Sequence, residues 1–275
     1  MSEVPTLTLA NGVVMPALGF GTSPMGDAQT ETAVTAALGA GYRLIDTAEN
    51  YGNEGGVGRG IRASGVDRDE VFVTTKFNER WHDEDGVRLA LANSAERLGL
   101  EVIDLLLIHW PNPQQDRYVQ AWRGMIRLLE AGQVRAIGVS NFKPEHLDRL
   151  RDETGVVPHV NQIELDPRHS RAEERAYHRE HGIVTESWSP LGAGNDLLTV
   201  PTIVDLAERR KRTPAQIVLR WHVQLGTIPI PKTATPSRMS ENLDVFDFEL
   251  TGDEMAELAQ LDGTDDVMDS DRFGH

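Results

Sequence analysis

The stretch VFVTTKFNERWHDEDGVRLALANSAERLGLEVIDLLLIHWP, residues 71–111, contains the pattern that decides the fold of this chain. Two short apolar runs, residues 71–76 and 102–109, flank residues 87–99, in which apolar side chains recur at intervals of three and four. Such runs are typical of buried strands, and the spacing between them is typical of an amphipathic helix. Because a strand, a helix and a second strand make a βαβ unit, this stretch predicts a parallel sheet.

The same alternation of apolar run and helix-like segment continues along the whole chain. It yields eight candidate strands, at residues 16–22, 42–46, 71–76, 102–109, 134–140, 159–163, 182–187 and 226–232. Eight repeats without a break favour a closed sheet, so the expected fold class is α/β, a (β/α)₈ TIM barrel that occupies residues 1–275 as one domain.

Both ends of the chain carry segments outside the barrel repeat. We expect residues 6–16 to form a β-hairpin that turns at Asn11-Gly12 and precedes the first barrel strand. A C-terminal helix is expected from about Asp253, followed by an acidic tail at residues 263–275. We expect that tail to be poorly ordered unless a ligand or the barrel rim holds it.

The amino-acid composition indicates which class of ligand or partner the chain can bind. The chain has 27 Lys and Arg against 43 Asp and Glu, a net charge of −16, which repels nucleic acid and anionic membranes, so we expect a small-molecule ligand. The absence of cysteine excludes disulfides and thiolate metal sites. No signal-peptide pattern occurs, and no apolar run approaches the ~18 residues of a membrane span. We expect a cytoplasmic protein that acts as a monomer.

Three successive candidate strands end in residues that can move or stabilise a proton. The carboxyl ends of barrel strands are where function is found, and Asp46, Lys76 and His109 stand there, with Tyr51 five residues after Asp46. A phenol with a reference pKa near ~10 is a weak acid, and a nearby ammonium favours its phenolate. We expect Lys76 to supply that charge, Asp46 to orient Lys76, and His109 to polarise a substrate oxygen.

The sequence lacks the motifs of several other kinds of site. The nine histidines contain no H-x-H or H-E-x-x-H, so no metal is expected, and no G-x-S-x-G elbow marks a serine nucleophile. Residues 58–63, GRGIRA, fit the dinucleotide fingerprint G-x-G-x-x-A but follow a polar segment instead of an apolar strand. We interpret them as a helix packed against the barrel.

Seven motifs along the chain resemble, in order, those of the aldo-keto reductases, and most closely those of the bacterial branch that includes 2,5-diketo-D-gluconate reductases. They are GYRLIDTAENYGNEGGVGRGI (41–61), VFVTTK (71–76), DLLLIHWP (104–111), GVSNF (138–142), NQIELDP (161–167), SWSPLG (187–192) and IPKTATPSRMSEN (230–242). The resemblance implies an NADPH-dependent reductase that converts aldehydes and ketones, such as dicarbonyls or keto-sugar acids, to alcohols.

The resemblance also implies a role for each site residue. Tyr51 is the expected general acid that protonates the carbonyl oxygen, Lys76 and Asp46 tune it, and His109 positions the carbonyl. The expected cofactor-binding residues are Gly21, Thr22, Asp46, Ser140, Asn141, Gln162, Trp188, Ser189, Leu191, Gly192, Lys232, Thr233, Arg238 and Asn242. Among them Trp188 is the expected stacking platform for nicotinamide, where many relatives have tyrosine.

Two further expectations concern specificity. Lys232, Thr233 and Arg238 resemble a pocket for the 2′-phosphate, which favours NADPH over NADH because lysine and arginine bind phosphate. Aromatic side chains just beyond strand ends are expected to wall an apolar substrate pocket, namely Phe20, Trp81 and Trp110.

Two alternatives of different class stay open at this point. One is a protein that binds NADPH on the same fold without turnover. The other is an aldolase-type barrel in which Lys76 forms a Schiff base, which requires a lysine that has lost its proton. Pairing of Lys76 with Asp46 counts against the second, because a carboxylate keeps an ammonium charged.

Overall fold

In the computed structural model, which describes residues 4–263 and 268–274, eight parallel strands form one sheet in sequence order. They are β3 (Phe20–Gly21), β4 (Leu44–Asp46), β5 (Phe72–Phe77), β6 (Ile103–Ile108), β7 (Val134–Ser140), β8 (Val160–Glu164), β9 (Val184–Trp188) and β10 (Ile228–Pro229). The amides of Gly19 and Gly21 donate to the carbonyls of Pro229 and Pro231, both at 3.0 Å, and so join the first strand to the last. The predicted barrel is confirmed.

The first and last barrel strands are shorter than the apolar runs that predicted them. Each has two residues in the ladder, where runs of seven were expected. Pro229 and Pro231 have no N–H to donate, so this edge is held only by their carbonyl oxygens.

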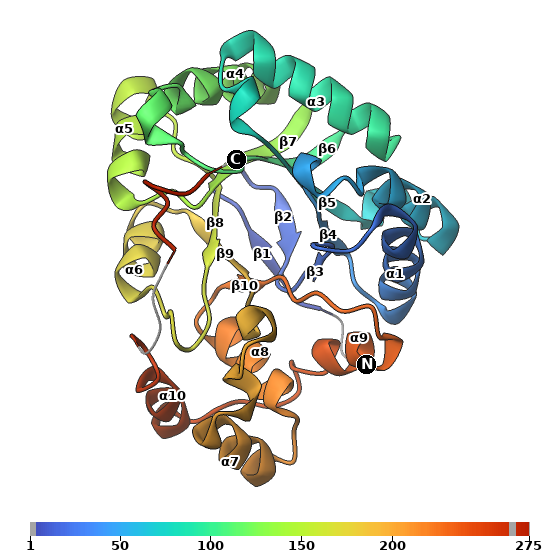
Figure 1. The fold of residues 1–275 in the computed structure, drawn as a ribbon, viewed down its shortest axis with the longest axis vertical. Helices are drawn as coiled ribbons and strands as arrows, with labels where there is room; N and C mark the ends of the chain where they lie inside the picture. The colour runs from blue at the N-terminus through green and yellow to red at the C-terminus, as the bar shows by residue number, and fades with distance from the viewer. Residues whose placement is uncertain (1–3, 264–267, 275) are drawn as a thin grey trace.

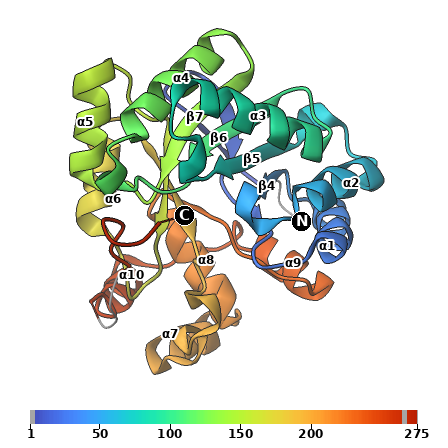
Figure 2. The same cartoon turned by 45° about the horizontal axis from the view of Figure 1, so that its top comes forward.

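Helices surround the strands as an outer ring (Figures 1 and 2). They are α1 (Asp27–Ala40), α2 (Glu54–Ser64), α3 (Glu84–Leu98), α4 (Tyr118–Glu130), α5 (Pro144–Thr154), α6 (Ala172–Glu180), α7 (Pro201–Arg210), α8 (Pro214–Gln224), α9 (Pro236–Leu243) and α10 (Gly252–Ala259), with short 3₁₀ turns at Glu49–Tyr51, Arg68–Glu70, Glu79–Trp81, Pro113–Gln115, Gly192–Gly194 and Leu197–Thr199. None of the helices in the described part of the chain is long and apolar enough to cross a membrane.

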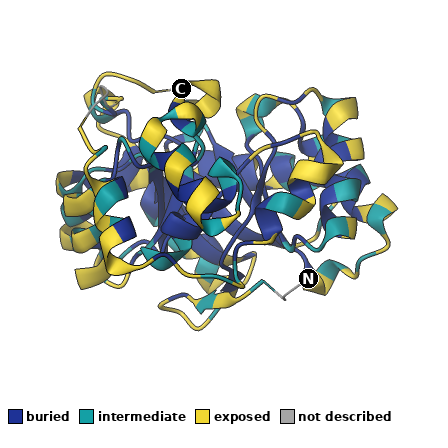
Figure 3. Cartoon of the chain, turned by 90° about the horizontal axis from the view of Figure 1, so that it is seen from below, coloured by how far each residue is buried: buried dark blue, intermediate teal, exposed yellow. Residues whose placement is uncertain are grey.

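The strands are buried, while the outer helices have exposed faces (Figure 3). Because side chains alternate along each strand, they form two apolar layers. One layer lies between the strands and the helices and contains most of the buried apolar side chains. The other fills the barrel interior and consists mainly of Leu44, Phe72, Leu105, Leu107, Ala136, Val160, Ile228 and Ile230. Leu9 and Met15 of the hairpin formed by β1 (Thr6–Thr8) and β2 (Val14–Pro16) belong to this inner layer. The predicted hairpin is therefore confirmed, and it packs into the barrel interior.

The described part of the tail lies against the barrel rim. Residues 264–267 and 275 fall outside the described residues, so the expectation for the tail applies here to residues 268–274. The Lys143 ammonium pairs with the Asp269 carboxylate at 2.7 Å and also with Asp271. The ring centroids of Phe273 and Trp110 lie 5.1 Å apart. The rim thus holds residues 268–274.

The GRGIRA stretch lies within helix α2, as expected: Ile61 is buried in the layer between strands and helices, while Gly58 and Gly60 approach neighbouring helices. A Cβ added at Gly58 would meet the carbonyl oxygen of Leu98 at 1.9 Å, and one at Gly60 would meet that of Glu31 at 2.8 Å. Glycine is required at these positions because the backbones approach too closely for any side chain.

We predict that Gly58→Ala lowers the free energy of unfolding by about 1–3 kcal/mol, because the added methyl group meets backbone that cannot move aside. Gly39→Ala is the matched control: Gly39 lies in helix α1 with open space at its Cβ, so alanine should raise that free energy by about 0.5–1 kcal/mol. Urea denaturation measures both, and equal effects of the two substitutions would contradict the packing account.

Candidate active site

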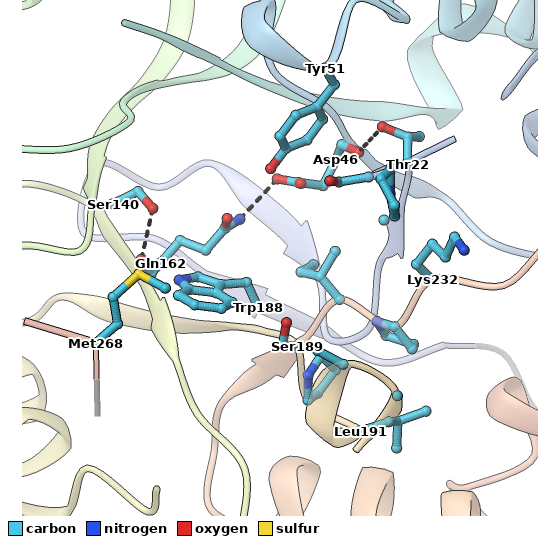
Figure 4. Close-up of a pocket in the computed structure, with 18 of the residues that line it drawn as sticks. Thr22, Asp46, Tyr51, Ser140, Gln162, Trp188, Ser189, Leu191, Lys232 and Met268 are labelled. Atoms are coloured by element: carbon cyan, nitrogen blue, oxygen red, sulfur yellow. Dashed lines mark hydrogen bonds between the residues drawn. The ribbon is translucent and has the colours of Figure 1, made fainter. Parts of the chain in front are cut away.

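A cavity of about 760 Å³ opens at the carboxyl ends of the strands. Its volume lies within the range of small-molecule sites. Most of the residues expected at a site line it, and Figure 4 shows several of them around one opening. They are Gly21, Thr22, Asp46, Tyr51, His109, Trp110, Ser140, Asn141, Gln162, Trp188, Ser189, Leu191, Lys232 and Arg238.

A buried ion pair forms the floor of the cavity. Lys76 has no exposed surface, and its Nζ lies 2.7 Å and 2.8 Å from the two carboxylate oxygens of Asp46 and 2.9 Å from the carbonyl oxygen of Thr47. Three acceptors therefore receive the three protons of the ammonium. Burial opposes the charge on Lys76, but Asp46 and the neighbouring acids hold its pKa above the ordinary value. A lysine kept charged in this way is unsuited to form a Schiff base.

Tyr51 lies over this pair. It ends the 3₁₀ turn that follows β4, and the chain leaves the turn through Gly52 in the left-handed region, at φ 66°. Lys76 Nζ is 5.2 Å from the centroid of the Tyr51 ring, and the His109 ring is 5.9 Å away, nearly perpendicular. Burial raises the pKa of Tyr51, and the expected lowering by Lys76 opposes that effect without cancelling it. The phenol is therefore protonated at neutral pH.

Asn141 connects three strand ends. It follows β7 in the left-handed region, at φ 64°, a conformation that asparagine adopts more readily than most residues. Its Nδ2 donates to the carbonyl oxygen of His109 at 3.1 Å, and its Oδ1 accepts from the indole Nε1 of Trp188 at 2.8 Å. This bond fixes the plane of the Trp188 ring at the cavity wall (Figure 4).

Gln162 lies between two carboxyl groups. Its Nε2 donates to Asp46 Oδ2 at 2.8 Å (Figure 4). It also donates to Glu186 Oε2 at 3.0 Å, which uses both hydrogens of the amide. Glu186 itself is fully buried on β9. Burial, together with repulsion from Asp46, raises the pKa of Glu186 to about 8.

Two cations stand on the cavity wall without a counter-ion. Lys232 and Arg238 are exposed, and within the described residues their side chains form no hydrogen bond or ion pair. Other arginines, such as Arg59 and Arg210, are paired with carboxylates. In a chain that is strongly acidic as a whole, such a pair of cations can attract an anion locally.

Comparison with known proteins shows the family of this chain. The model of the family described as "Aldo/keto reductase family" matches residues 17–263. This chain belongs to the aldo/keto reductase family.

Individual members of the family are similar over nearly their whole length. The 2,5-diketo-D-gluconic acid reductase B of a Corynebacterium species is 51% identical, with 95% of each chain covered. Methylglyoxal reductase DkgA of Escherichia coli is 47% identical, with 100% of each chain covered. The structure of a mutant of Gox0644 in complex with NADPH has a TM-score of 0.93 at 44% identity, with 98% of each chain covered.

Three expected cofactor residues of this family member do not line the cavity. Gly192 lies directly after the lining residue Leu191. Thr233 is buried, and its hydroxyl accepts from the amide of Thr235 at 3.1 Å, at the start of helix α9. Asn242 is buried on the same helix beside Tyr42. Thr233 and Asn242 therefore support the segment that carries Arg238.

Two of the three aromatic residues expected in the substrate pocket lie elsewhere. Phe20 is fully buried in the layer between strands and helices, with its ring 5.4 Å from that of Tyr42, because β3 turns this side chain away from the barrel axis. Trp81 donates from its indole to Glu49 at 3.0 Å and does not line the cavity. Trp110 does line it.

Several residues at or beneath the cavity were not predicted from the sequence, and three of them bear on its chemistry. Met268 and Phe273 line the cavity from the tail, and the signal was their apolar character within an acidic segment. Glu186 lies under the cavity, and the signal was a carboxyl group inside an apolar run.

We predict that Lys76→Met lowers the free energy of unfolding by about 3–5 kcal/mol, because it leaves the buried Asp46 carboxylate without its cation. The double variant Lys76→Met with Asp46→Asn should lose less than the sum of the two single variants, since neither charge is then left alone. Urea denaturation of all three variants measures this coupling, and simple additivity would contradict the ion-pair account.

Proposed function

We propose that this chain reduces aldehydes and ketones to alcohols, with NADPH as the hydride source and Tyr51 as the proton donor. One observation carries the proposal: a single cavity contains a protonated phenol above a buried ammonium–carboxylate pair and, on its wall, two cations that have no counter-ion in the part of the chain that the structure describes. The names of the similar reductases and the NADPH complex of Gox0644 support the same reaction.

The cavity offers fitting groups for the nicotinamide and for the 2′-phosphate of the cofactor. Trp188 presents a flat ring on which nicotinamide can stack, and Gln162 presents a carboxamide oxygen to the same space. Ser140 and Asn141 add polar groups beside it. Lys232 and Arg238 suit the 2′-phosphate, which distinguishes NADPH from NADH. When bound, NADPH supplies the hydride.

The reaction requires one hydride at the carbonyl carbon and one proton at the oxygen. Tyr51 donates the proton as the C=O π bond breaks, and Lys76 stabilises the phenolate that results. His109 donates to or polarises the carbonyl oxygen and so orients the substrate. Asp46 keeps Lys76 charged throughout, and a proton from solvent restores Tyr51 after each turnover.

The substrate contacts a mixed surface. Trp110, Met268 and Phe273 give the cavity apolar walls, while Asn50 and His109 give it polar groups. This combination suits small dicarbonyls and keto-sugar acids, in which an activated carbonyl adjoins polar substituents. The names of the two curated relatives agree with that substrate class.

We predict that Tyr51→Phe lowers turnover by about 100-fold or more, because it removes the proton donor and keeps the ring. The variant should bind NADPH as the wild type does. Consumption of NADPH in the presence of a dicarbonyl measures the first effect, and a fluorescence titration measures the second. Undiminished turnover by the variant would overturn the role of Tyr51.

We predict that Arg238→Ala weakens NADPH binding by about 10- to 100-fold and leaves NADH binding nearly unchanged, because only NADPH carries the phosphate that Arg238 would contact. Arg88→Ala, at an exposed arginine of helix α3, is the matched control and should change neither affinity. Equal losses for both cofactors would refute the phosphate site.

A further inference from the structure

We infer that Glu186 positions the Gln162 amide for the nicotinamide carboxamide and that its negative charge favours the oxidised cofactor over the reduced one. The inference rests on the proposed function, since it concerns the same cofactor site. Glu186 does not line the cavity, so it acts through a neighbour and is a positioning residue.

The strand directs Glu186 into the barrel. Successive side chains of a strand point to opposite faces, and the Thr185 hydroxyl lies 2.9 Å from His178 of the outer helix α6. Thr185 therefore faces outward and Glu186 inward. Glu186 has no exposed surface, and its Oε2 accepts from Gln162 Nε2 at 3.0 Å.

Two carboxyl groups determine which way the Gln162 amide points. Asp46 Oδ2 and Glu186 Oε2 take both of its N–H groups, at 2.8 Å and 3.0 Å. A flipped amide would place its oxygen against these two acceptor oxygens, with no N–H between them. The amide oxygen is therefore left as the acceptor for the cavity, where the N–H₂ of a carboxamide is its natural donor.

The charges around Glu186 do not balance. Lys76 on β5 is the cation facing it, and Asp46 on β4 already pairs with Lys76. The other groups beside it are the Gln162 amide on β8, which donates to its Oε2, and the apolar Ile228 on β10, which is its partner in the strand ladder. The second oxygen of Glu186, Oε1, has no hydrogen-bond partner among the described residues. A proton on this carboxyl group relieves the excess negative charge.

Glu186 titrates within a pH range in which cofactor binding can be measured. Its pKa is raised to about 8, so the group is neutral below that pH and charged above it. The pKa values of Tyr51 and Lys76 are raised above their ordinary values of 10.0 and 10.5, so neither group titrates between about pH 6.5 and 9. Within that window, rising pH adds a negative charge below the nicotinamide site.

The two redox states of the cofactor respond differently to this charge. The oxidised nicotinamide ring is positive and the reduced ring is neutral, so a charged Glu186 attracts only the oxidised form. If the bound ring lowers the pKa of Glu186 by about one unit, the ratio of the two dissociation constants changes about tenfold across the window. Alcohol oxidation is then favoured at high pH through cofactor binding as well as through mass action.

The test measures the dissociation constants of NADP⁺ and NADPH for the full chain at intervals from about pH 6.5 to 9, by fluorescence. The ratio of the two constants cancels the titration of groups that both cofactors share, such as the 2′-phosphate. Three variants accompany the wild type: Glu186→Gln, which keeps an acceptor for Gln162 without the charge, Glu186→Ala, which removes both, and Glu164→Gln. Glu164 is the control, because burial raises its pKa too, but His169 and Arg171 are its neighbours.

In the wild type and in Glu164→Gln, the ratio of the NADP⁺ constant to the NADPH constant should fall about tenfold as the pH rises. Glu186→Gln should bind both cofactors with a ratio that no longer depends on pH, and Glu186→Ala should weaken both. A pH-dependent ratio that persists in Glu186→Gln would overturn the inference and leave the proposed function intact. A wild type that binds neither cofactor would instead refute the proposed function.

Discussion

An ammonium with no exposed surface persists only where each of its protons meets an acceptor, and this condition governs Lys76. The Asp46 carboxylate and the carbonyl oxygen of Thr47 supply these acceptors from the end of the adjacent strand. The same carboxylate accepts from Gln162, and the Asp46 carbonyl oxygen accepts from the Thr22 hydroxyl at 2.9 Å. The ion pair thus links residues of the three strands β4, β5 and β8, and Tyr51 lies over it.

The buried charged group around Lys76 and the exposed cations Lys232 and Arg238 lie in different parts of the site. The proposed proton-transfer group is held in the low-dielectric barrel end, where Asp46 keeps Lys76 charged and burial keeps Tyr51 protonated. The proposed anion-binding pair, Lys232 and Arg238, stands exposed on the wall of the same cavity. An acidic protein can bind an anionic cofactor in this way, because a local pair of uncompensated cations outweighs distant charges that solvent screens.

The strand-end pattern allowed most of this arrangement to be predicted. Polar residues that end parallel strands must meet at one rim, which brought Asp46, Lys76 and His109 together without knowledge of distances. The direction of a side chain was harder to predict: Phe20 follows an apolar run but faces the helices, because its strand has two residues and shows no alternation. Glu186 was missed because a carboxyl group inside an apolar strand indicates no role in the sequence alone. Its role becomes visible only when the structure places Gln162 beside it.

The most direct test of the central claim is a transfer experiment with NADPH deuterated at the hydride position and a panel of aldehydes, dicarbonyls and keto-sugar acids. The account predicts that NADPH absorbance falls and that one deuterium appears on the carbinol carbon of the alcohol. Tight binding of NADPH with no oxidation by any carbonyl of the panel would contradict it and would identify the chain as a protein that binds the cofactor without turnover.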